Sequence, residues 1–216
     1  MSGGHDHNDP PLPLTQQGTF YGQGQSGNPL ILKTDMSGRA VVDSLVASQI
    51  AGRYIVTASL AAASAIRDTV NLTVTVPGLE LLPESQNYVK LGGTCEHHGP
   101  SDKGLADVPA NCRTPDNNHW IQAEAVDSLQ RAAETFHSAE WNRTREAMRI
   151  NDISLSFGGL FDIDGSWRNP HDSHRTGKDV DIENAGKLGR LLQVLERRRW
   201  RYISEEAGRF PHFRFR

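Results

Sequence analysis

The chain has 216 residues, a formal net charge of −3, 37% hydrophobic and 7% aromatic residues, and two cysteines. No run approaches the roughly 18 consecutive apolar residues of a membrane-spanning helix, and the near-neutral charge argues against a dedicated nucleic-acid binder. Two cysteines are too few for a disulfide-dense mini-protein or a four-cysteine zinc module. The composition leaves a globular protein of one large or two small domains.

Residues 1–19 are rich in Gly, Pro and Asp and poor in apolar side chains, so we expect a flexible tail. They lack the basic start and the apolar segment of a secretory signal peptide, so none is predicted in this chain. His5 and His7 offer metal-ligating atoms, but a flexible tail would leave their positions undefined.

A β-rich region follows the tail, with runs at residues 29–34, 40–42, 53–60 and 68–76. In the last run, every second residue is Val or Leu and the others are polar, which is the period of a half-buried strand. Turn sequences at 35–38 and 51–52 separate the runs. Several short strands at this spacing predict a small antiparallel sandwich.

Two segments of this region carry a family resemblance. Residues 34–40 read Thr-Asp-Met-Ser-Gly-Arg-Ala, and residues 51–58 read Ala-Gly-Arg-Tyr-Ile-Val-Thr-Ala. They resemble the later strands of bacterial Ig-like repeats, of the form T-D-x-x-G-x-A … A-G-x-Y-x-V-x-A. The resemblance implies an all-β Ig-like sandwich over residues 20–78, serving as a spacer or adhesion module on a bacterial surface. Pro77 and Gly78 end the last strand, so we expect a linker at 79–85 and a second domain at 86–216.

Residues that can bind a metal or take part in acid–base chemistry are concentrated after residue 84. Residues 1–84 hold four Lys/Arg and seven Asp/Glu, and residues 85–216 hold nineteen of each, so the charge of −3 lies wholly in the first part. All four tryptophans, both cysteines and seven of the nine histidines fall in the second part. Because histidine and carboxylate groups serve acid–base chemistry and metal ligation, we expect the functional site there.

The second part has the pattern of an α+β domain. Helical spacing of Val126, Leu129, Ala133 and Phe136 predicts a helix over 121–139. A second helix is predicted at 184–197, and strands are predicted at 149–157, 178–182, 200–204 and 212–215.

The strand at 178–182 carries the clearest chemical signal. Alternation places its aliphatic residues on one face and Asp179 and Asp181 together on the other. Gly177 allows a turn that folds His174 back over this polar face. His212 on the last strand can join them, because adjacent antiparallel strands bring residues within about 5 Å.

Two histidines and an aspartate suit a divalent metal such as zinc, with one coordination position left for water. Taken singly, His174 also fits a hydrogen-bonded loop histidine, and Asp181 a turn residue at a strand end. The combination within the string Asp-Val-Asp-Ile at 179–182 favours metal ligation.

The segments 152–159 and 173–182 resemble the LAS group of zinc peptidases, which includes lysostaphin-type enzymes, D-Ala-D-Ala peptidases and hedgehog domains. The nearest pattern is that of penicillin-insensitive murein endopeptidases, D-x-S-x-x-x-G-G … S-H-x-x-G-x-D-V-D-I. The resemblance covers residues 149–216 and implies an α+β fold with a small antiparallel sheet, zinc on His174, Asp181 and His212, and hydrolysis of peptide bonds in peptidoglycan stem peptides or cross-links. The matching motif residues are Asp152, Ser154, Gly158, Gly159, Ser173, His174, Gly177, Asp179, Val180, Asp181 and Ile182.

The C-terminus departs from that family in one respect. The family carries an H-x-H pair there, whereas this chain has Phe210 in place of the first histidine. Because that histidine is expected to assist at the reacting carbonyl, its loss bears on rate and substrate preference more than on metal binding. The departure keeps open an alternative, a non-catalytic extracellular binding or adhesion protein with a structural or vestigial zinc.

Zinc-dependent hydrolysis also needs a base. Glu205 and Glu206 precede the His212 strand, where LAS peptidases often place one, although an exposed pair of turn glutamates fits the same sequence. The residues expected to line the substrate groove or support the ligands are Ser173, His171, Asp179, Arg175 and Arg214.

A disulfide between Cys95 and Cys112 is favoured over a second metal site in the same loop. The Ig-like and peptidoglycan resemblances both imply an oxidising, extracytoplasmic location, where disulfides persist. In that location the lack of a signal peptide suggests that Met1 begins a fragment of a longer secreted protein. The expected partner is peptidoglycan or a peptide, with no nucleic acid and no membrane span.

Overall fold

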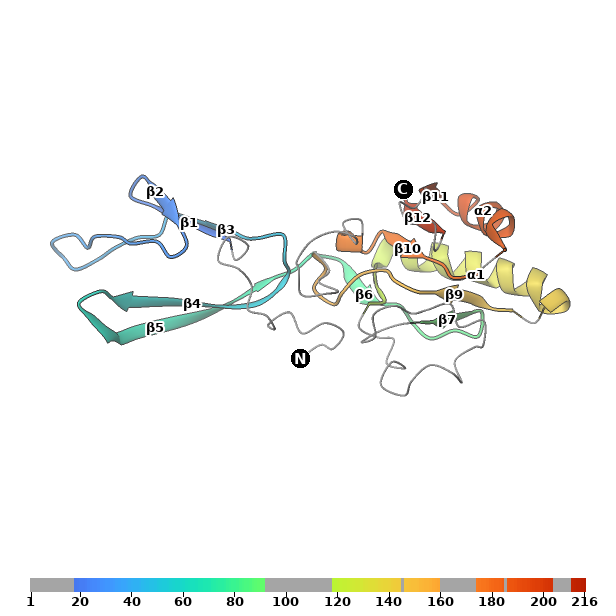
Figure 1. The fold of residues 1–216 in the computed structure, drawn as a ribbon, viewed down its shortest axis with the longest axis horizontal. Coiled ribbons are helices and arrows are strands. Elements are labelled where there is room, and N and C mark those ends of the chain that lie inside the picture. Colours follow the sequence, from blue (N-terminus) through green and yellow to red (C-terminus); the bar gives the residue numbers. More distant parts are fainter. Residues whose placement is uncertain (1–17, 92–117, 145, 160–173, 185, 204–210) are drawn as a thin grey trace. The chain divides into compact units, whose positions relative to one another are not determined.

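The computed structural model describes residues 18–91, 118–144, 146–159, 174–184, 186–203 and 211–216 (Figure 1). These residues belong to two compact units that divide after Thr75, and each unit is described by itself. Within the described ranges, no helix is both long enough and apolar enough to cross a membrane. The domain limits expected from the sequence stay a prediction.

Residues 18–75 of the first unit form two small antiparallel sheets. Strands β1 (Thr19–Gly22), β2 (Gln25–Gly27) and β3 (Ser44–Val46) pair in the order β2-β1-β3. Strands β4 (Gly52–Leu60) and β5 (Ala63–Val74) form the long hairpin of Figure 1. These two strands confirm the runs at 53–60 and 68–76, the second shifted towards its N-terminal end.

The predicted strands at 29–34 and 40–42 are wrong, because both segments are irregular. The Gln23 side chain donates to the Lys33 carbonyl at 2.7 Å and accepts from the Lys33 amide at 3.1 Å, so a side chain takes the place of a strand partner. The predicted turn at 35–38 is confirmed, with Asp35 Oδ1 accepting from the amides of Ser37 and Arg39.

Little of the first unit is buried. Among residues 18–75, Ile50 is the one apolar side chain that is buried, whereas Ile55 on β4 is 71% exposed. The strands described in this range therefore do not enclose the core of an Ig sandwich. The Ig-like architecture stays a prediction.

The second unit mixes helices with small sheets. Strand β6 (Leu79–Leu81) pairs antiparallel with β8 (Trp120–Gln122), and β7 (Tyr88–Lys90) pairs parallel with β9 (Met148–Ile150). Strands β10 (Asp179–Asp181), β12 (His212–Phe215) and β11 (Trp200–Ile203) form an antiparallel sheet in that order. The helices are α1 (Ala123–Thr144), α2 (Leu188–Glu196) and the 3-10 turn η5 (His174–Thr176).

Both predicted helices and the strands predicted at 178–182 and 200–204 are confirmed with shifted ends, and the strand at 212–215 is confirmed with the ends predicted. The strand predicted at 149–157 is shorter in the structure and ends with β9 at Ile150. After β9 the backbone forms hydrogen bonds with segments outside the strands, and Ile153 N, for example, donates to the Asn118 carbonyl. Residues 79–85, expected as a linker, contain β6 and the fully buried Leu82, whose amide donates to the His119 carbonyl. This segment is thus built into the second unit.

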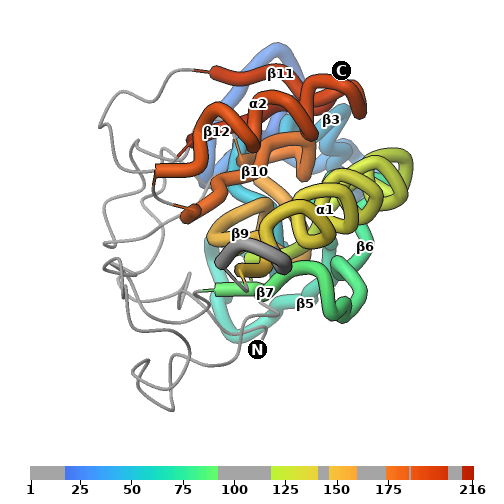
Figure 2. The backbone as a smooth tube through the Cα atoms, turned by 90° about the vertical axis from the view of Figure 1, so that its right-hand side faces the viewer, coloured from blue at the N-terminus to red at the C-terminus, as the bar shows by residue number. Residues whose placement is uncertain are grey.

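The second unit has a continuous apolar core. Helix α1 contacts β7, β8, β9 and α2. Of these neighbours, β7, β9 and α2 are labelled in Figure 2. Val180 on β10 and Phe213 on β12 are fully buried in the same core. Since successive strand residues point to opposite faces, the other face of β10 and β12 is left for polar side chains. The core residues of α1 and α2 are Ala125, Val126, Leu129, Ala132, Ala133, Phe136, Leu191, Val194 and Leu195.

Candidate metal centre

The register of β10 and β12 brings the predicted ligands together. Asp181 lies opposite His212, and Asp179 lies opposite Arg214. Cross-strand partners share a face of the sheet, so these four side chains lie on the face away from Val180. The alternation expected from the sequence is confirmed at this strand pair.

His174 reaches the same face through a tight turn. Gly177 ends η5 with φ +71°, a conformation that side chains disfavour, and a Cβ at this position would overlap the Leu79 side chain. The Gln122 amide donates to the Gly177 carbonyl at 3.0 Å, and Gln122 Nε2 donates to the Thr176 carbonyl at 2.9 Å. Strand β8 thereby braces the turn that carries His174.

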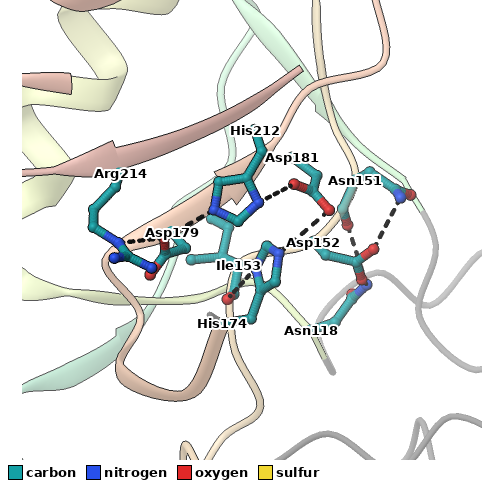
Figure 3. Close-up of polar contacts among 9 residues, drawn as sticks. All are labelled: Asn118, Asn151, Asp152, Ile153, His174, Asp179, Asp181, His212 and Arg214. Carbon is teal, nitrogen blue, oxygen red and sulfur yellow. Dashed lines mark hydrogen bonds and ion pairs between the residues drawn. The ribbon is translucent and has the colours of Figure 1, made fainter. Parts of the chain in front are cut away.

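The three side chains converge on one point (Figure 3). His174 Nε2 lies 3.3 Å from Asp181 Oδ2, and His212 Nδ1 lies 3.1 Å from Asp181 Oδ1. One ligand atom from each residue falls within 4.8 Å of the others. The residues are 1%, 5% and 8% exposed for His174, Asp181 and His212, so solvent offers these groups little compensation.

The polar atoms of this group fit a cation. Asp181 Oδ1 is buried and accepts no hydrogen bond from the described residues, although His212 Nδ1 is 3.1 Å away. The Ile153 carbonyl can only accept, so in the neutral imidazole His174 Nδ1, at 3.0 Å, carries the proton and the Nε2 lone pair is directed at Asp181. Two imidazole nitrogens and a carboxylate are a donor set that zinc prefers. The group could therefore hold a metal ion.

The same contacts control protonation when no metal is bound. Burial alone would lower the pKa of His212, but the hydrogen bond to Asp179 and the contact with Asp181 outweigh it and raise the pKa to about 9. Burial likewise opposes charging of His174, yet neighbouring Asp181 raises its pKa overall. Burial would raise the pKa of Asp181, and the two histidines instead hold it well below its usual range. A proton and a metal ion thus compete for one site.

A polar cluster next to the ligands supports the loop that carries Ile153. Asp152 accepts from the side-chain amides of Asn118 and Asn151, and its own carbonyl accepts from the Asp181 amide at 2.9 Å. The negative charge of Asp152 also favours the protonated form of His174. The sequence motif included Asp152 but not the two asparagines. The sequence feature that could have pointed to them is the Asn-Asn pair at 117–118 and the Asn-Asp pair at 151–152.

The remaining predicted site residues divide into two groups. Asp179 and Arg214 lie beside the ligands, with Asp179 Oδ1 accepting from His212 Nε2 at 2.9 Å and from Arg214 Nε at 2.8 Å. Arg175 follows His174 in η5, and its carbonyl accepts from the Gly159 amide at 2.9 Å. The residues that fall outside the described ranges are His171, Ser173, Glu205, Glu206, Phe210, Cys95 and Cys112.

Comparison with protein-family models and with curated proteins finds no match for this chain. The second unit is therefore a mixed α+β fold with a buried His–Asp–His group that could bind a metal, and no family is identified.

Proposed function

We propose that the chain is a zinc-dependent peptidase. The observation that carries the proposal is the convergence of His174, Asp181 and His212, whose ligand atoms lie within 4.8 Å of one another. Within the described ranges this group has three members, one fewer than the four ligands of a closed structural zinc site. Three protein ligands are the usual set of a zinc site that performs hydrolysis.

Zinc bound here would supply Lewis-acid polarisation of a carbonyl and activation of a water molecule. The chain's own residues would hold the metal ion: Asp181 provides a negative charge, and the two imidazoles provide neutral donor atoms from η5 and β12. Because β10 and β12 are held by the core through Val180 and Phe213, the ligands are fixed on rigid elements.

The substrate class rests on the resemblance to LAS peptidases. By that resemblance, the scissile bond is an amide in a peptidoglycan stem peptide or cross-link, and the protein acts outside the cytoplasm. The same resemblance supports Glu205 or Glu206 as the group that moves the proton. The first unit would then be an Ig-like spacer that presents the peptidase to the cell wall.

A second candidate is favoured by one feature of the sequence, Phe210 in place of the histidine that LAS peptidases carry two residues before the last ligand. Under this proposal the chain is an extracellular binding or adhesion protein whose zinc is structural. It predicts zinc binding without hydrolysis, so one set of measurements separates the two candidates.

The test combines metal content with hydrolysis of purified peptidoglycan and of its soluble stem peptides. The unsubstituted protein should bind one equivalent of zinc, and His174→Ala or Asp181→Asn should lose it along with any hydrolysis. His137→Ala is the matched control, since His137 is a half-buried histidine of α1 whose Nδ1 contacts Asn87. It should keep both zinc and activity.

Zinc content that survives both His174→Ala and Asp181→Asn would contradict the assignment of the metal centre. Stoichiometric zinc in the unsubstituted protein with no cleavage of either substrate would reject the peptidase in favour of the binding protein.

A further inference from the structure

We propose that Asp179, held in place by Arg214, is a positioning residue that presents His212 Nδ1 to the metal. The inference rests on the proposed zinc site and adds a role for two residues that do not themselves touch the ion. It concerns how one ligand is oriented, a property that the three ligand residues alone do not determine.

The contacts form a chain across the sheet (Figure 3). Arg214 Nε donates to Asp179 Oδ1 at 2.8 Å, and the same oxygen lies 2.9 Å from His212 Nε2. Asp181 contacts the other side of the ring, 3.1 Å from Nδ1. His212 therefore lies between two carboxylates, one at each ring nitrogen.

The two ring nitrogens of His212 therefore differ in protonation. An ionised carboxylate only accepts, so the nitrogen facing Asp179 carries a proton. In the neutral imidazole that binds a metal, a proton on Nε2 leaves the lone pair on Nδ1, which faces Asp181. With the opposite tautomer, Nδ1 would be protonated and could not ligate.

Burial makes Asp179 an effective orienting group. Its side chain is 2% exposed, so water does not compete for the carboxylate, while the Arg214 side chain is 49% exposed. Arg214 compensates the buried charge and fixes the carboxylate on the side of the ring away from Asp181.

The other histidine is oriented by a different group. His174 Nδ1 donates to the Ile153 carbonyl at 3.0 Å, a neutral acceptor. A carboxylate partner makes the imidazole a stronger donor to the metal than a carbonyl does. The structure thus assigns a carboxylate support to His212, at its Nε2 atom.

The experiment measures zinc affinity by competition with a chelating indicator on the full chain. Loss of an outer partner of a ligating histidine weakens metal binding by roughly 10–100-fold, and we expect that loss in both Asp179→Asn and Asp179→Ala. Arg214→Gln should weaken binding by a smaller factor, because Asp179 remains.

Two controls match these variants. Glu183→Gln removes another buried carboxylate that pairs with an arginine, Arg149 at 3.8 Å. Arg201→Gln removes the arginine facing Arg214 on the same sheet. Both should bind zinc as tightly as the unsubstituted protein.

Nitrogen-15 NMR of the histidine rings supplies a readout that a purely structural role would not change. In the zinc-loaded protein the Nε2 proton of His212 should exchange slowly with water, and in Asp179→Ala its exchange should become fast. If Asp179→Asn and Asp179→Ala bind zinc within twofold of the unsubstituted protein, or if the Nε2 proton exchanges as slowly in Asp179→Ala, the positioning role is wrong.

Failure of the metal site itself would look different. If the unsubstituted protein binds no zinc, the proposed function fails, and the metal-free protein then decides the role of Asp179. A protected Nε2 proton that disappears in Asp179→Ala would support the orienting contact, and its absence from the unsubstituted protein would overturn it.

Discussion

The two units of the chain differ in how many of their side chains are buried. In residues 18–75 the strands are paired but mostly exposed, and Ile50 is the one buried apolar side chain described there. In the second unit, side chains from two helices and several strands form one core. On the surface of that core the second unit also buries His174, Asp179, Asp181 and His212.

This contrast gives a physical reason why the candidate metal centre lies in the second unit. Ligand groups bind a metal more tightly when their positions are fixed before the metal arrives. The core fixes β10 and β12, and the buried carboxylate of Asp179 obtains two hydrogen-bond donors there, His212 and Arg214. The hairpin of the first unit offers edges and exposed faces, which suit a spacer or binding module.

The largest expected difference between the units comes from one substitution made in both. Ile121 on β8 is fully buried and Ile55 on β4 is 71% exposed, and both occupy strands. Ile121→Ala should destabilise the second unit by about 2–5 kcal/mol, because it leaves a cavity in a packed core. Ile55→Ala should change the free energy of unfolding by no more than about 0.5 kcal/mol.

Urea unfolding of the full chain, followed by circular dichroism, measures both variants. Equal losses of stability would show that Ile55 is packed in solution, and the contrast in burial between the units would not hold.

Alanine substitutions at two glycines should have a smaller effect on stability, and comparing them separates backbone strain from packing. Gly24 has φ +72° with nothing within 4 Å of a Cβ, and Gly177 has φ +71° with Leu79, Gln122 and Trp120 in contact range. Gly24→Ala should cost about 1 kcal/mol, the penalty for a left-handed alanine. Gly177→Ala should cost about 1–3 kcal/mol more, because its methyl group also overpacks the β6–β8 region.

Thermal unfolding gives the two losses, and zinc titration provides a second measure, since Gly177 ends the turn that holds His174. Zinc affinity should fall in Gly177→Ala and stay unchanged in Gly24→Ala. Equal losses at both positions would mean that the crowding around Gly177 is relieved at no cost.

The sequence predicts the long elements of this fold well and the short ones poorly. Helix α1 and hairpin strands β4 and β5 have enough residues for a period to show. Strands β6 and β7 have three residues each and pair with β8 and β9, distant segments, so no local pattern could indicate them. Their pairing is decided by burial in the core rather than by propensity.

The site divides in the same way. Alternation at 179–182 and the turn at Gly177 suffice to bring His174, Asp181 and the His212 strand together, as the structure shows. The support of His174 could not be predicted, because the group that orients it is the backbone carbonyl of Ile153, and every residue has one. A side-chain partner such as Asp179 can be recognised from its residue type in the sequence, whereas a backbone partner cannot.

The last prediction concerns pH, and the sign of the effect differs between the units. In metal-free protein the pKa of His212 is raised to about 9, from an ordinary value near 6.5. A raised pKa stabilises the folded state fully below the unfolded value, and this contribution is lost as pH rises through about 9. The second unit should therefore lose stability between about pH 6.5 and 9, by at most about 1.4 kcal/mol per pH unit for this group.

In the first unit the side-chain hydrogen bond from Ser37 and the amide of Arg39 lower the pKa of Asp35, so its contribution is present above the unfolded value and is lost as pH falls. Urea titrations of chelator-treated protein across pH 5–9.5 measure the slope in the second unit, and His212→Gln should flatten it. Zinc should flatten it as well, because the bound metal replaces the proton on Nδ1. A slope unchanged by His212→Gln would mean that the proton resides elsewhere, and the competition between proton and metal at this histidine would be ruled out.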